Sequence, residues 1–290
     1  MTVCLTKVRR REIMKKIPTG VSDLDAIIKG GVPAGSVVLL FTEIGAGGLE
    51  YVYTSSAKIL RVKEEPRDIS AILGDVCKGS VLPEDVFYIT FSRSKEDILD
   101  EVKASFNQDY YDMIENGLKF EDFSQEYFQR TMVPSGWSRE PNANDLFSES
   151  TESDLLDELV HFLDNNAENN MVVIDSITDL LTNSSIDENK LVTIIKGMRR
   201  ASKKWGGIIY LLLSKGIVDK SLEYQIIDSV DGVLSFEWSK TSRSSQRQRY
   251  LLVDKFMSVL PHLKREKIAR FTAEVTDYQG YTVINYQKIR

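Results

Sequence analysis

Short runs of apolar residues recur along the chain, each bounded by glycine, proline or polar residues. Their length and β-branched content are typical of strands buried on both faces. We expect such strands at 37–41, 85–91, 171–175, 206–214 and 250–254, and final strands at 271–275 and 281–286. Because strands of this kind belong to sheets covered by helices, the pattern predicts an α/β fold.

Segments with helical spacing of apolar residues lie between these runs. They predict helices at 49–62, 94–102, 154–163 and 191–204. Ser94 and Asp97 have nearly the spacing of a capping box, which places the start of the second helix. Residues 104–150 are less regular and rich in aromatic side chains. We interpret them as an insertion that packs its aromatic residues on the sheet edge; the alternative is a partner-binding or lid segment.

Composition limits the class of protein. The 290 residues, 42% hydrophobic, have room for one large α/β domain or two small ones. A net charge of -6 and a pI near 5.2 disfavour nonspecific nucleic-acid binding by the whole surface, although a local basic face is compatible with them. Cys4 and Cys77 are too few for a disulfide framework, and we expect no metal site because no Cys/His cluster occurs.

Targeting signals are not evident in the sequence. The N-terminal segment 1–16 is basic but has no apolar stretch long enough for a signal peptide. No apolar run reaches the roughly 18 residues of a membrane span. We therefore expect a cytoplasmic protein without a membrane span. The basic segment is interpreted as a solvated tail or edge strand, or as an arm that lies on a partner.

A glycine-rich loop joins the first predicted strand to the first predicted helix, which is the arrangement of a P-loop, G-x-x-x-x-G-K-[ST]. Thr42 stands at the first glycine position and Gly47 at the second, while Gly48 takes the lysine position and Leu49 the magnesium-ligating Ser/Thr position. The cation and the hydroxyl are therefore both missing. The backbone can still form an anion nest. The degenerate nucleotide or anion site comprises Gly45, Ala46, Gly47, Gly48 and Leu49.

Two segments that frame this loop carry a family resemblance. Residues 17–25, Ile-Pro-Thr-Gly-Val-Ser-Asp-Leu-Asp, and 30–40, which begin Gly-Gly-Val-Pro-Ala-Gly, resemble the entry to the RecA-like ATPase domain of the KaiC and RadA families. The resemblance implies a RecA-like P-loop NTPase fold over residues 17–290, with a mostly parallel central sheet flanked by helices and antiparallel strands at the C-terminal edge. Archaeal KaiC-like members with a degenerate Walker A motif are similar.

The resemblance also implies roles for individual residues. Asp175 and Ser176 match the end of the Walker B strand, which positions magnesium in the family. Ser92 stands where the family has its catalytic Glu, so we expect no catalytic residue. Lys255 matches a lysine that reaches the nucleotide of the adjacent subunit.

Two basic stretches near the C-terminus are candidates for binding a partner. Such a surface could meet nucleic acid, an acidic protein or a neighbouring subunit, and it could equally be a solvated face. The candidate residues are Lys240, Arg243, Arg247, Arg249, Lys264, Arg265 and Lys267.

Together these features predict a noncatalytic protein with a regulatory, signalling or scaffolding role, and a protein partner or self-association. We expect no cofactor, although weak binding of ATP, ADP, phosphate or sulfate is compatible with the loop. One alternative is an ATP-binding protein or slow ATPase that uses a substitute lysine, such as Lys95 or a neighbour's Lys255. Another is a nucleic-acid-binding recombinase-like paralogue. Monomer, dimer and ring are equally reasonable assemblies.

Overall fold

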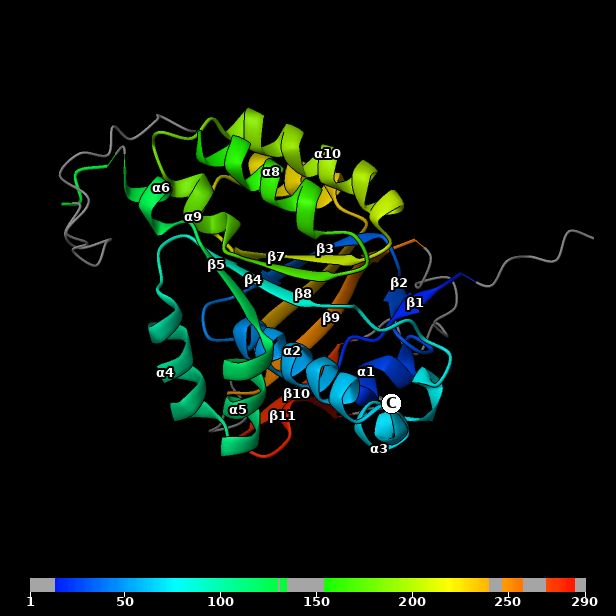
Figure 1. Cartoon of the computed structure of the whole chain (residues 1–290). Helices are drawn as coiled ribbons and strands as arrows, with labels where there is room; N and C mark the ends of the chain where they lie inside the picture. Colours follow the sequence, from blue (N-terminus) through cyan, green and yellow to red (C-terminus); the bar gives the residue numbers. More distant parts are fainter. Residues whose placement is uncertain (1–13, 130, 135–153, 240–246, 258–269, 285–290) are drawn as a thin grey trace, which may run out of the picture.

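A nine-stranded sheet forms the centre of the computed structural model, which describes residues 14–129, 131–134, 154–239, 247–257 and 270–284 (Figure 1). The spatial order is β11-β10-β9-β8-β3-β7-β6-β4-β5. The bounds are β3 Ser36–Thr42, β4 Val86–Thr90, β5 Lys119–Asp122, β6 Met171–Asp175, β7 Ile208–Ser214, β8 Gly232–Trp238, β9 Arg249–Phe256, β10 Phe271–Thr276 and β11 Gly280–Ile284.

Strands β8, β3, β7, β6, β4 and β5 pair in parallel. The antiparallel strands β9, β10 and β11 extend the sheet from β8 to one edge. Strand β3 lies between β7 and β8, and its last residue, Thr42, is level with Ser214 and Phe236. The expected α/β fold, with a mostly parallel sheet and antiparallel strands at the C-terminal edge, is confirmed.

Helices cover both faces of the sheet (Figure 1). Alternate residues of β3 point to opposite faces: Val38 and Leu40 join the core beneath α2, while Val37 and Leu39 join the core beneath α8 and α10. This explains the continuous apolar runs in the sequence. The bounds are α1 Ser22–Ile27, α2 Gly48–Glu64, η1 Pro66–Asp68, α3 Ile69–Ile72, η2 Asp75–Cys77, α4 Lys95–Ser105, α5 Gln108–Gly117, α6 Ser124–Phe128, α8 Leu155–Asn166, α9 Ile177–Thr182, α10 Glu188–Trp205 and α11 Lys220–Ser229.

A short antiparallel ribbon of β1 (Lys16–Ile17) and β2 (Val32–Pro33) precedes the large sheet. Gly31 lies at φ 110°, and a Cβ there would stand 2.0 Å from the Ile17 carbonyl oxygen, so only glycine fits. Of the basic segment 1–16, residues 1–13 lie outside the described residues. Lys16 donates to the Ile28 carbonyl (2.7 Å), which ties β1 to the end of α1.

The region 104–150 is more regular than the sequence suggested. It contains α5, α6 and β5, which pairs in parallel with β4 at the sheet edge. Phe120 packs on Tyr88 and Phe123 stacks on Phe91, so aromatic residues of this region do pack on the sheet edge. Residues 135–153 lie outside the described part. No helix among the described residues is long and apolar enough to cross a membrane.

Candidate functional site

The glycine-rich loop joins the end of β3 to the start of α2, as in a P-loop. Gly45 (φ 72°) and Gly47 (φ 112°) take left-handed backbone conformations that glycine adopts readily. No described residue accepts a hydrogen bond from the N–H groups of Gly48, Leu49 or Glu50 in the first turn of α2. These N–H groups are therefore without an acceptor in the described chain, as is usual at a helix N-terminus.

Position 48, which corresponds to the P-loop lysine, is crowded by a neighbouring side chain. A Cβ at Gly48 would stand 3.0 Å from both Cβ and Oγ1 of Thr42. Thr42 is held in place because its hydroxyl donates to the Glu43 carbonyl (3.0 Å). Thr42 and Gly48, which stand at the first glycine and lysine positions of the motif, are thus coupled, because a side chain added at position 48 would crowd Thr42.

Two side chains from the antiparallel hairpin cover the loop. Trp238 at the end of β8 donates its indole N–H to the Ile44 carbonyl (3.0 Å), and Arg249 at the start of β9 donates Nε to the Gly45 carbonyl (3.3 Å). The Arg249 guanidinium lies 4.9 Å from the centre of the Trp238 ring and 3.6 Å from a Glu50 carboxylate oxygen. This cation is therefore engaged with an aromatic ring and a carboxylate of the same chain.

Asp175, the Walker B-like residue, is buried at the end of β6. The Tyr88 hydroxyl donates to its Oδ2 (2.6 Å), and Nη1 of Arg93 lies 3.6 Å from the same oxygen. Burial raises the pKa of Asp175 to about 6, although the Tyr88 hydrogen bond and the Arg93 charge oppose the rise. Arg93 also pairs with Glu101. The chain itself thus supplies the cation that faces this carboxylate.

Ser92 and Ser176 are both engaged with Asp179. The Ser92 hydroxyl donates to an Asp179 carboxylate oxygen (2.9 Å). Ser176 is the N-cap of α9 and accepts from the Asp179 N–H (3.3 Å). The hydroxyl at the position of the family's catalytic Glu therefore contacts the start of a helix.

Lys255 lies near the end of β9. The glycine-rich loop lies at the other end of the neighbouring strands. Lys255 pairs with Val233 at the start of β8, and its ammonium donates to the carbonyls of Ile227 (2.8 Å) and Asp228 (2.9 Å) in the last turn of α11. This is a favourable place for a cation. In the described chain Lys255 therefore stabilises a helix end. Lys95 lies over the Phe120 ring, 5.4 Å from its centre.

The predicted basic residues differ in their surroundings in the structure. Arg247 is exposed, whereas Arg249 is part of β9 and contacts the glycine-rich loop. Lys240, Arg243, Lys264, Arg265 and Lys267 lie outside the described residues. A nucleic-acid interface on these loops stays a prediction. Among the described residues, no group of three or more His, Cys, Asp or Glu side chains could hold a metal ion.

Three contributors to the site were missed from the sequence. Tyr88 was assigned to a buried strand, Trp238 to a connection, and Arg249 to a partner-binding loop. For Trp238 and Arg249 the sequence did carry a signal, because the two residues flank the predicted hairpin connection. In the structure they pair with each other across β8 and β9. No local signal links Tyr88 to Asp175, which lie on neighbouring parallel strands far apart in the chain.

Comparison with known proteins supports the fold. The chain is similar to the crystal structure of a KaiC-like protein from the hyperthermophilic archaeon Pyrococcus horikoshii, with a TM-score of 0.59 and 18% identity over 94% of this chain and 100% of that chain. No family model and no curated protein matches the sequence. The expected KaiC-type RecA-like fold is therefore confirmed, while the chemistry of the site rests on this chain's own residues.

Proposed function

We propose that this protein is noncatalytic and acts in a regulatory, signalling or scaffolding role through a protein partner or self-association. The observation that carries the proposal is the engagement of Asp175 by Tyr88 and Arg93. In an intact site this carboxylate would face hydrated magnesium. Here an arginine from the neighbouring strand end supplies the positive charge, so a metal is not needed to balance Asp175.

The loop supports the same proposal. A lysine at position 48 would contribute a charge-assisted hydrogen bond worth roughly 1.5–3 kcal/mol to phosphate binding, and this chain has glycine there. The nearby Arg249 is paired with Glu50 and stacked on Trp238. Without the magnesium hydroxyl and the carboxylate base, positioning of a metal and of an attacking water is also lost.

Calorimetric titration with ATP and magnesium tests this proposal, together with an assay for phosphate release. We expect neither magnesium-dependent binding nor hydrolysis by the natural protein. The matched variant is Thr42→Gly/Gly48→Lys/Leu49→Thr, which restores the motif and removes the crowding at position 48. It should bind ATP about 10- to 100-fold more tightly than the natural protein, still without turnover, because Ser92 cannot act as a base.

The control is Gly48→Lys/Leu49→Thr with Thr42 retained. It should bind ATP less tightly than the triple variant, because the new Cβ would stand 3.0 Å from Thr42 and the loop or that side chain must shift. Tight magnesium-dependent binding or turnover by the natural protein would overturn the proposal. It would direct attention to a substitute cation, as in the alternative of a slow ATPase.

A second candidate function is weak anion binding at the loop, and the unpartnered N–H groups at the start of α2 favour it. Phosphate, sulfate, ATP or ADP would then bind through backbone hydrogen bonds without magnesium. The same titration without the metal tests this candidate. Heat of equal size with and without magnesium supports it, and no heat for any of the four anions rejects it.

A further inference from the structure

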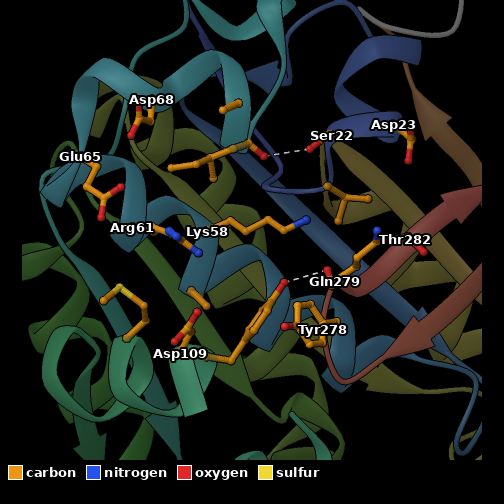
Figure 2. Close-up of a pocket in the computed structure, with 16 residues that line it drawn as sticks. Ser22, Asp23, Lys58, Arg61, Glu65, Asp68, Asp109, Tyr278, Gln279 and Thr282 are labelled. Atoms are coloured by element: carbon orange, nitrogen blue, oxygen red, sulfur yellow. Dashed lines mark hydrogen bonds between the residues drawn. The ribbon is translucent and has the colours of Figure 1, made fainter. Parts of the chain in front are cut away.

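A cavity of about 510 Å³ lies away from the glycine-rich loop, between α1, α2, α3, α5 and the β10–β11 hairpin (Figure 2). Its volume falls in the range of small-molecule sites. Lys58 lies ten residues after Gly48 on α2, about 15 Å along the helix axis. This cavity is therefore separate from the nucleotide-site equivalents.

Two cations of α2 extend across the cavity. Lys58 and Arg61 are three residues apart, so they lie on one face of the helix. Figure 2 shows the Lys58 ammonium pointing into the cavity between Ser22 and Thr282. Neither cation has a hydrogen-bond or ion-pair partner among the described residues. Lys58 is partly buried and Arg61 is exposed, so the two cations line the cavity from its inner part to its opening.

The helix end does not account for Lys58. Favourable interaction with the helix dipole falls off within the last turn, and Lys58 lies six residues before the end of α2 at Glu64. Burial lowers the pKa of Lys58, and the charges of Asp23 and Asp25 offset this lowering only in part. An anion bound beside this ammonium would offset that cost.

The remaining lining completes an amphipathic site. Ala57, Ile72 and Met113 supply apolar surface around the cations. Tyr278, 78% exposed at the hairpin turn, offers an aromatic ring at the rim. Carboxylates of Asp23, Glu65, Asp68 and Asp109 lie at the periphery in Figure 2 and are exposed to solvent.

These exposed carboxylates repel every anion, and the repulsion grows with the number of charges on the ligand. A polyanion such as nucleic acid is therefore repelled most strongly, whereas a small anion can lie within hydrogen-bond distance of Lys58 and Arg61, where the solvent-screened repulsion is weaker than their attraction. The combination of paired cations, apolar walls and an aromatic rim fits a compact anionic head on an apolar or aromatic body. From this geometry we propose that the cavity binds a small organic phosphate or carboxylate, with its anionic group on Lys58 and Arg61.

Titration of the full chain with phenyl phosphate and with benzoate tests the site and distinguishes its two anion classes. Benzylamine, which has a similar ring but a positive charge, is the ligand control and should not bind. Lys58→Met and Arg61→Met should each weaken binding of the preferred anion about 10- to 100-fold. Lys196→Met, at an exposed position on α10, is the matched protein control and should change binding less than twofold.

The melting temperature of the ligand-free variants separates a binding role from a structural one. Lys58→Met should change this temperature by no more than a few degrees, because relief of the desolvation of Lys58 and loss of its charge interactions with Asp23 and Asp25 oppose each other. Failure of both anions to bind, or binding that Lys58→Met and Arg61→Met leave unaltered, would overturn the proposal. Binding at the glycine-rich loop would give the latter result, because neither substitution alters the backbone there.

Discussion

Asp25 provides a quantitative test of the packing around α1. Its side chain is fully buried. Oδ1 accepts the Thr19 N–H (2.8 Å), while Oδ2 has no hydrogen-bond partner among the described residues. Burial raises the pKa of Asp25 from 3.8 to about 7. The folded protein therefore keeps a proton on Asp25 over a pH range in which the unfolded chain has released it.

This difference makes folding stability fall as pH rises. When the pKa of a carboxyl is higher in the folded than in the unfolded state, its contribution to stability is fully present below the unfolded pKa. That contribution is lost as the pH rises from the unfolded pKa through the folded pKa. Each pH unit in that window is worth about 1.4 kcal/mol. From pH 5 to pH 8, Asp25 alone should lower the free energy of unfolding by about 3 kcal/mol, with most of the loss below pH 7.

The perturbation is Asp25→Asn, and the assay is urea unfolding at several pH values between 5 and 8. The amide does not titrate but can still accept the Thr19 N–H. The variant should therefore lose about 3 kcal/mol less than the natural protein over this range. The raised pKa of Asp175 contributes to the remaining slope in both proteins. Asp100→Asn, at an exposed position on α4, is the control and should keep the natural slope. An undiminished slope in Asp25→Asn would refute the assignment to Asp25.

Three further substitutions test contacts of the site and its neighbours. Tyr88→Phe removes the hydroxyl donor to Asp175 and should lower the free energy of unfolding, measured with urea at pH 8, by about 1.5–3 kcal/mol. A loss below about 0.5 kcal/mol would contradict a hydrogen bond to a charged carboxylate. Trp238→Phe keeps an aromatic ring but removes the N–H donor to the Ile44 carbonyl, so amide hydrogen exchange in residues 43–47 should accelerate. Unchanged exchange would mean that this donor does not hold the loop. Ser94→Ala removes the N-cap of α4 and should lower the free energy of unfolding by about 1 kcal/mol. Ser94→Asp should keep most of this stability, and equal losses in the two variants would argue against capping.

The fold was largely predictable because its signals are local or repeated. The strand predicted at 37–41 corresponds to β3 Ser36–Thr42, and the strand predicted at 85–91 corresponds to β4 Val86–Thr90. The capping box was also readable, since Ser94 and Asp97 are close in the sequence, and both of its hydrogen bonds are present. A buried strand or a cap is specified within a few residues, so the sequence alone suffices.

Residues 108–128 are more regular than their sequence pattern indicates. Strand β5, Lys119–Asp122, is short, partly exposed and bordered by charged residues. It lacks the apolar run that marks the central strands. Its pairing with β4 depends on the sheet edge that the rest of the fold provides.

The contacts that occupy the site could be predicted only in part. The missing lysine, hydroxyl and glutamate were evident from aligned positions. What replaces them was not, because Arg93 and Tyr88 reach Asp175 from a neighbouring strand, and Arg249 reaches Gly45 across the sheet. These contacts depend on strand register and side-chain direction. Aligning a motif shows which residues a loop lacks. The fold determines which residues from distant parts of the chain contact that loop instead.

The coupling between Thr42 and Gly48 has a consequence for how this sequence can change. A lysine introduced first at position 48 would place its Cβ 3.0 Å from Thr42, so that side chain or the loop must shift to make room. A glycine introduced first at position 42 removes β-branched packing from a central strand and gains nothing for phosphate binding. The effect of a substitution at either position therefore depends on the residue at the other, and we expect the two effects to be non-additive.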